Sequence, residues 1–211
     1  MSKFRDSEDG QGPVGNLGAE MLALLMLFNG TTFDRARGDV TNGLDVDVTR
    51  LPAGESHIGQ VGAAKDIVDV TLTLDTVAYA AGDVLSDTAT LANAMRVNGG
   101  KGMLRSITVI DEDDQGAPFD IYFFKVTQNL GTKNAAPTIT DAAARDCLGV
   151  VSIAAADYKD LGGVRIATVR GVDLALESDA ASRDIFIGTV TQGTPTHTAN
   201  GLRLKFGIEQ G

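Results

Sequence analysis

The sequence predicts a mainly β protein, an antiparallel jelly-roll-like β-sandwich preceded by an N-terminal arm and a short helix. The chain has 25 glycines in 211 residues, which favours many tight turns over long helices. In most segments after residue 64, apolar residues alternate with polar ones, as in strands with one buried face. Only residues 141–148 offer a helix in that half, so a parallel sheet would lack its helical crossovers.

The first 28 residues predict an arm followed by a helix. Residues 1–18 mix charged residues with glycines and cannot fold alone, so their ordering would need a partner. Residues 19–28, AEMLALLMLF, contain strong helix formers and precede Asn29-Gly30, a helix stop signal. This helix would be apolar nearly all round, hence buried in its own domain or in a contact with another subunit. The candidate partner-binding residues are Met21, Leu22, Leu24, Leu25, Leu27 and Phe28.

Residues 31–64 are rich in glycine and short polar pieces and are predicted to be a connecting segment. Within it, residues 44–48 alternate strictly and predict a short strand. Asp45 and Asp47 would share one face of that strand. Two carboxylates on one face could bind a metal ion, but no third oxygen ligand stands at a usable spacing. We therefore favour a solvated face over a metal site.

Eight segments after residue 64 have the composition and alternation of strands. They are residues 67–74, 89–97, 102–111, 119–126, 163–169, 172–176, 184–190 and 201–208. Asn98-Gly99-Gly100 and residues 113–116 are turn signals of the kind that joins antiparallel strands. Eight strands without crossovers predict a jelly roll over residues 65–211, with residues 1–64 as a separate N-terminal region.

The acidic run 111–114 resembles the start of a calcium-binding loop, but its fifth and twelfth positions are Gln115 and Tyr122. A solvated turn is favoured over a weak cation site. His57 and His197 are too few for a three-histidine zinc site, and lone loop histidines are usually surface residues. Cys147 stands in a run of small apolar residues and is predicted to be a buried small hydrophobe. We expect no catalytic residue, no metal and no cofactor.

Charge and hydropathy exclude several partners. The chain has 18 Lys plus Arg against 28 Asp plus Glu, a net charge of -10, which is the wrong sign for nucleic acid or anionic lipid. Its longest apolar run is too short to span a membrane, and a single cysteine cannot form an internal disulfide. We expect no nucleic-acid partner, no membrane association and no secretion.

Residues 29–39 and 42–52, NGTTFDRARGD and NGLDVDVTRLP, resemble a segment common in tailed-bacteriophage virion proteins that often precedes a distal β-domain. Residues 58–61, IGQV, look like a short unit that such proteins sometimes repeat. Residues 79–85, 93–102, 119–124 and 202–210 are similar to a phage structural β-sandwich family of the head decoration, or cement, type. The resemblance implies a virion structural protein without catalytic residues.

The resemblance implies first a capsid decoration protein that is made in the bacterial cytoplasm and located on the capsid surface. Its partners would be the major capsid protein and copies of itself, in a homo-oligomer such as a trimer, with residues 1–64 making the contacts. The alternative is a tail, neck or baseplate component, either an adaptor or a glycan-binding domain. Most aromatic residues fall in strand patterns and are predicted core, which disfavours glycan binding. They include Tyr122, Phe123, Phe124, Phe186 and Phe206.

Overall fold

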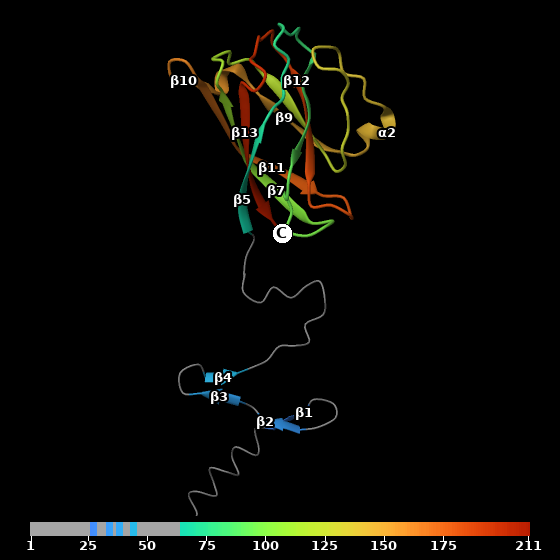
Figure 1. The fold of residues 1–211 in the computed structure, drawn as a ribbon, viewed down its shortest axis with the longest axis vertical. Helices are drawn as coiled ribbons and strands as arrows, with labels where there is room; N and C mark the ends of the chain where they lie inside the picture. Colours follow the sequence, from blue (N-terminus) through green and yellow to red (C-terminus); the bar gives the residue numbers. More distant parts are fainter. Residues whose placement is uncertain (1–25, 29–32, 36, 40–42, 46–63) are drawn as a thin grey trace, which may run out of the picture. The chain divides into compact units, whose positions relative to one another are not determined.

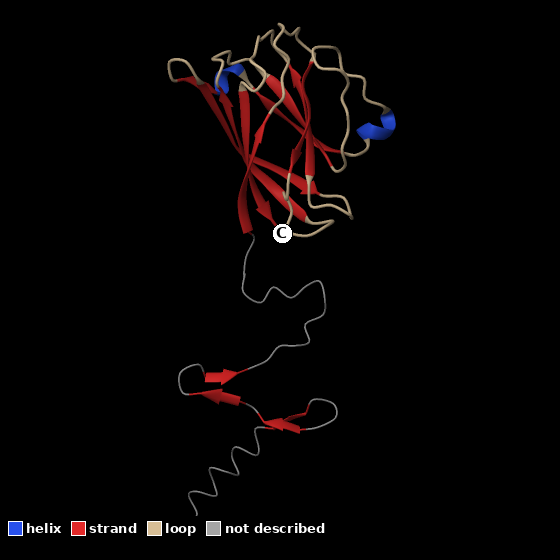
Figure 2. Ribbon diagram, viewed as in Figure 1, coloured by secondary structure: helices blue, strands red, loops and turns tan. Residues whose placement is uncertain are grey.

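The computed structural model describes residues 26–28, 33–35, 37–39, 43–45 and 64–211 (Figure 1). The chain divides into two units, residues 1–58 and 59–211, and each is described by itself. Strands account for most of the regular structure in the described residues (Figure 2). No helix in this described part is both long enough and apolar enough to cross a membrane.

The described residues of the first unit form two antiparallel hairpins. β1 (Met26–Phe28) pairs with β2 (Phe33–Arg35), and β3 (Arg37–Asp39) pairs with β4 (Gly43–Asp45). The helix predicted for residues 19–28 is therefore wrong over residues 26–28, whereas residues 19–25 lie outside the described residues. Asn-Gly is also a strong hairpin signal, and pairing across it outweighs the weak intrinsic preference for helix. The strand predicted for 44–48 is observed at Leu44 and Asp45, and its remainder lies outside the described residues.

The second unit contains two antiparallel sheets. The first has the strand order β10-β11-β7-β13-β5 and the second the order β6-β12-β8-β9. The strands are β5 (Ala64–Thr71), β6 (Val84–Leu91), β7 (Lys101–Asp111), β8 (Phe119–Phe124), β9 (Cys147–Ile153), β10 (Tyr158–Asp160), β11 (Arg165–Glu177), β12 (Ile185–Thr191) and β13 (Leu202–Gln210). Two short helices, α2 (Asp141–Ala144) and the 3-10 helix η1 (Ala155–Asp157), complete the unit.

This strand order is that of a jelly roll. Apart from the short β10, the first sheet joins β5, β13, β7 and β11, which are the first, eighth, third and sixth strands along the chain. The second sheet joins β6, β12, β8 and β9, the second, seventh, fourth and fifth. Eight antiparallel strands wound in this way form the double Greek key of the jelly roll. The predicted fold class is confirmed.

Several strand predictions differ from the structure. The strand predicted for residues 89–97 overlaps β6 only at residues 89–91, because β6 ends at Leu91 and residues 92–97 lie in turns and bends. Residues 163–169 and 172–176 belong to one strand, β11, whose register against β7 shifts between Arg170 and Leu174. A local irregularity of this kind shifts the alternation, so one strand resembles two in sequence. Strand β9 was not predicted, because its first residues were assigned to a helix over 141–148. That helix ends at Ala144, and Cys147 already begins β9.

The interior of the sandwich is filled by apolar side chains from the inner faces of both sheets. At its centre, the rings of Phe123 on β8 and Phe206 on β13 meet edge to face, with centroids 5.8 Å apart. Both rings are fully buried, and leucine, isoleucine and valine side chains surround them. The space between the sheets is therefore a packed core.

The two ends of the sandwich differ in what they carry. Ala64 at the start of β5 pairs with Gln210 at the end of β13, so the chain enters the sandwich beside the C-terminus. The loops 72–83, 112–118 and 192–201 connect the strand ends at the opposite end (Figure 1). The start of β5 therefore lies at the end of the sandwich away from these loops.

Candidate functional site

The structure describes only part of the predicted partner-binding segment. Met21, Leu22, Leu24 and Leu25 lie outside the described residues, as do His57 and Asp47. Leu27 and Phe28 lie in β1, where they pair across the hairpin with Asp34 and Phe33. Partner binding by this segment stays a prediction.

His197 is buried, contrary to the expectation of a surface histidine. Only 4% of the residue is exposed, and its Nδ1 lies 3.3 Å from Asp113 Oδ2 and 3.9 Å from Asp111 Oδ1. Asp111 is also buried, at 1% exposure. The acidic run 111–114 is therefore partly buried, and the prediction of a solvated turn is wrong for Asp111.

The two carboxylates hold the loops at this end of the sandwich. Both oxygens of Asp111 accept backbone hydrogen bonds, from the Asp113 N–H at 3.1 Å and the Gly116 N–H at 2.6 Å. Asp113 accepts hydrogen bonds from Thr198, at 2.8 Å from its backbone N–H and at 2.9 Å from its hydroxyl. A Cβ atom at Gly201 would overlap the Asp113 carboxylate. We call this cluster of Asp111, Asp113 and His197, with its Thr198 donors, the loop clamp.

The loop clamp offers three ligand atoms within 4.8 Å of one another, from Asp111, Asp113 and His197. Metal sites can be built from such atoms. Here, however, the carboxylate oxygens already accept hydrogen bonds from backbone and threonine donors, which the fold of the two loops requires. The arrangement fits a structural link between the loops 112–118 and 192–201, and we assign it that role.

We expect Asp113→Ala to lower the free energy of unfolding by about 2 kcal/mol. The substitution leaves the buried His197 imidazole without its Asp113 acceptor, and an unsatisfied buried polar group costs about 1–3 kcal/mol. The exposed Thr198 N–H also loses this acceptor but can bond to water instead. Urea denaturation followed by circular dichroism measures the difference. Glu112→Ala is the matched control, since its exposed ion pair with Arg203 should contribute less than about 1 kcal/mol. Equal costs for the two variants would contradict the clamp.

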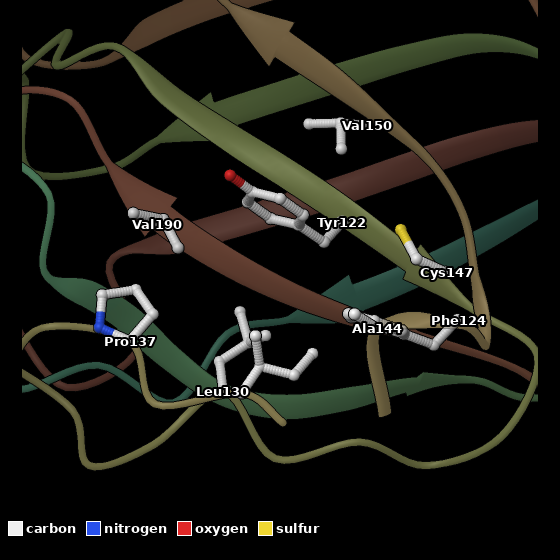
Figure 3. A pocket seen from close by; sticks show the side chains of 9 residues that line it. Tyr122, Phe124, Leu130, Pro137, Ala144, Cys147, Val150 and Val190 are labelled. Atoms are coloured by element: carbon white, nitrogen blue, oxygen red, sulfur yellow. The ribbon is translucent and has the colours of Figure 1, made fainter. Parts of the chain in front are cut away.

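A second feature, an apolar cavity, lies on the outer face of the sheet β6-β12-β8-β9. It has a volume of about 230 Å³, is partly open to solvent, and lies between this face and residues 125–146, which we call the strap (Figure 3). Side chains of β8, β9 and β12 form one side, and side chains of the strap form the other. The lining residues are Tyr122, Phe124, Leu130, Pro137, Ile139, Ala144, Cys147, Val150 and Val190. We call this space the strap cavity.

Hydrogen bonds hold the strap along the edge of the sheet. The Val84 N–H donates to Ala135 O and the Asn134 N–H donates to Val84 O, both at 2.9 Å. Further along, the Thr88 hydroxyl donates to Gln128 O. These bonds cover part of the edge strand β6, where free backbone groups would otherwise invite pairing with another chain. They also fix the strap at a set distance from the sheet.

The strap packs on a second, smaller apolar cluster outside the main core. Val84, Phe124, Leu130 and Val190 are its buried members. Leu130 lies directly over Gly188 of β12, where any Cβ atom would overlap its side chain. Apolar contacts of Leu130 and hydrogen bonds along the edge strand β6 therefore hold the strap in place.

Three residues predicted to be core belong instead to this outer cluster. Phe124 is buried beneath the strap, while Tyr122 and Phe186 are partly buried members of the same cluster. Cys147 is half-buried and lines the strap cavity, so it is less buried than predicted. Alternation alone does not show which of two apolar faces lies inside, because here both faces of β8 contact apolar side chains.

The outer face of the other sheet is polar and carries ion pairs. Arg105 lies 2.8 Å from Glu209 and also contacts Asp173, and Lys205 lies 2.9 Å from Asp69. The hydrogen bond from Arg105 lowers the pKa of Glu209 below its usual value, which keeps the carboxylate charged. This face is therefore solvated, whereas the outer face of the other sheet, which carries the strap cavity, is apolar.

No family model matches this chain, and no curated protein matches it. Among solved structures, the chain is similar to Desmodium yellow mottle tymovirus at 11% identity and a TM-score of 0.27, over 76% of this chain and 94% of that chain. It is also similar to a full particle of Israeli acute paralysis virus heated to 63 degree, at 9% identity and a TM-score of 0.26, over 99% and 92%. A third structure, infectious bursal disease virus Gx strain, gives 14% identity and a TM-score of 0.17, over 88% and 46%. Similarities this weak carry no functional conclusion.

Proposed function

We propose that this chain is a structural protein of a virus particle, and specifically a tailed-phage capsid decoration protein that binds and stabilises the head lattice. One observation carries the proposal: a complete jelly roll follows a segment, residues 29–39 and 42–52, that resembles phage virion proteins. The jelly roll is a fold of viral capsid and lectin domains and of cupins. The N-terminal resemblance favours the virion among these.

The packing of the sandwich supports a structural role over an enzymatic one. Larger β-barrels enclose ligand cavities, whereas here Phe119, Phe123 and Phe206 fill the space between the sheets together with aliphatic side chains. The buried loop clamp at one end has its polar groups engaged with one another and with backbone donors. We therefore propose that the chain acts through its outer surfaces and its N-terminal region, without catalysis.

The mechanism we propose is binding to the assembled lattice only. A protein that binds the assembled state and not the separate subunits stabilises the assembly by its binding free energy. Residues 1–64 would contact the major capsid protein and neighbouring copies of this chain.

Copy number in purified virions distinguishes this proposal from the tail, neck or baseplate alternative. We expect on the order of hundreds of copies per particle, because a lattice protein repeats with the capsid symmetry. Quantitative mass spectrometry with an isotope-labelled peptide of residues 171–183, GVDLALESDAASR, measures the ratio to the major capsid protein. About a dozen copies or fewer would place the protein at the tail or at a single vertex and would overturn the decoration proposal.

A further inference from the structure

We propose that the strap cavity is a binding site for an uncharged, largely apolar small molecule that carries one hydrogen-bonding group. The inference does not depend on the role in the virion. It rests on the chemistry of the lining, the size of the space and the way in which the strap is held open.

The lining selects against charge. The lining contains no acidic, basic or histidine side chain: seven of its nine residues have hydrocarbon or proline side chains, and the other two are Tyr122 and Cys147. A charged ligand would lose part of its hydration here without gaining an ion partner, which is costly. An anionic group beside Tyr122 would also face the Asp120 carboxylate, which is close enough to influence the phenol. Neutral ligands avoid both costs.

Tyr122 supplies the one polar contact. Burial, and then the charge of Asp120, raise the pKa of its phenol, so the hydroxyl stays protonated at neutral pH. Among residues 64–211, no group forms a hydrogen bond with this hydroxyl, and Figure 3 shows it among the lining side chains. It can therefore donate to an oxygen on a bound molecule, or accept a hydrogen bond from it.

The cavity is large enough for a ligand and is formed before one binds. Its volume of about 230 Å³ exceeds the roughly 150 Å³ of an engineered apolar cavity that binds benzene. The strap cannot simply collapse to fill it, because backbone hydrogen bonds hold Asn134 and Ala135 to the edge strand. At the far wall, α2 contributes the small side chain of Ala144. A preformed site loses little binding energy to reorganisation.

Cys147 makes the test direct, because it is the single cysteine of the chain and lines the cavity. We would measure its alkylation by iodoacetamide in the full-length protein by intact-mass spectrometry. The probe is 1-naphthol, which is neutral at pH 7 and carries one hydroxyl. Its charge-altered control of similar size is 1-naphthoate. We expect saturating 1-naphthol to slow alkylation at least fivefold, and 1-naphthoate at the same concentration to leave the rate within twofold.

Two substitutions on the same short helix localise the effect. Ala144 lines the cavity and is exposed, so Ala144→Leu should fill the space without disturbing the core. Ala142 is exposed on the same helix and is not a lining residue, so Ala142→Leu is the matched control. Protection by 1-naphthol should persist in Ala142→Leu and disappear in Ala144→Leu. Saturation-transfer NMR on the probe should show binding to the same proteins.

Several results would overturn the proposal. One is the absence of both protection and NMR transfer up to the solubility limit of 1-naphthol. Equal protection by 1-naphthoate, or unchanged protection in Ala144→Leu, would contradict the ligand class or the location. Cys147 that is unreactive in concentrated protein and becomes reactive on dilution would show that a second copy of the chain covers the cavity instead.

Discussion

A shortened chain that begins at Gly59 is expected to fold but to bind particles lacking this protein at least about 100-fold more weakly than the full chain. Residues 59–211 form a unit with its own core, and starting at Gly59 keeps all of β5, which begins at Ala64. A cut at Lys65 would remove the first pair of the β5–β13 ladder, Ala64 with Gln210.

The expected loss follows from the apolar residues 21–28. Burying one leucine or phenylalanine side chain contributes about 1.5–3 kcal/mol, and each 1.4 kcal/mol changes affinity tenfold. If only two of the six candidate side chains become buried on the capsid, their removal costs about 3 kcal/mol, or roughly 100-fold in affinity. Ordering residues 1–18 costs conformational entropy and so reduces the net binding free energy. The arm becomes ordered only when residues 21–28 bind, so both effects are lost in the shortened chain.

The measurement is co-sedimentation of purified protein with particles that lack it, over a range of protein concentrations. A full-length variant with Leu24→Ser and Leu25→Ser tests the apolar segment without removing the arm, and it should lose at least tenfold. Deletion of residues 1–18 alone separates the arm from the apolar segment. Full-strength binding by residues 59–211 would move the attachment surface to the sandwich and contradict the role proposed for residues 1–64.

The fold was predictable because its determinants are local. Strands such as β13 alternate cleanly, with Leu202, Leu204, Phe206 and Ile208 buried and the residues between them facing outward. Such a period of two defines a strand and its inner face without knowledge of its neighbours. The absence of predicted crossover helices then left antiparallel sheets as the remaining arrangement.

The two sites could not be predicted because they depend on contacts between distant residues. Asp113 and His197 are separated by 84 positions in the sequence, and nothing in the polar sequence around His197 indicates burial. The strap cavity arises because residues 125–146 cross the outer face of a sheet, which turns an outward-facing Tyr122 into a lining residue. Only the three-dimensional path of the strap reveals this second apolar face.

The same argument explains why β9 was missed. Residues 141–148 have good helix-forming composition, but the chain from Cys147 pairs with Phe124 of β8 and continues that pairing to Ile153. Propensity is worth only tenths of a kcal/mol per residue and yields to tertiary packing. Gly149 in this strand also approaches Leu174 of β11 so closely that a Cβ atom would overlap it. Its φ of +156° is also one that residues with a side chain rarely adopt, and the two observations together explain why a glycine, unfavourable in most strands, stands here.

Phe206→Ala is expected to produce the largest loss of stability of any single substitution considered, about 3–5 kcal/mol. The Phe206 ring is fully buried and meets Phe123 of the opposite sheet at 5.8 Å and 90°. Removing it deletes apolar burial, leaves a cavity between the sheets and ends an aromatic pair. Domains of this kind have total stabilities of about 5–15 kcal/mol, so the variant should unfold at much lower urea concentration.

The matched controls lie on the same residue and the same strand. Phe206→Leu keeps most of the volume and should cost much less than the alanine substitution. Arg203→Ala on β13 removes only an exposed ion pair with Glu112, and we expect less than about 1 kcal/mol. If Phe206→Ala cost no more than Arg203→Ala, the space between the sheets would not be the packed core described above. A loss of the expected size would mean that the side chains between the sheets stabilise the fold and leave no room for a ligand. Binding must then use the N-terminal region, the loops or the strap cavity.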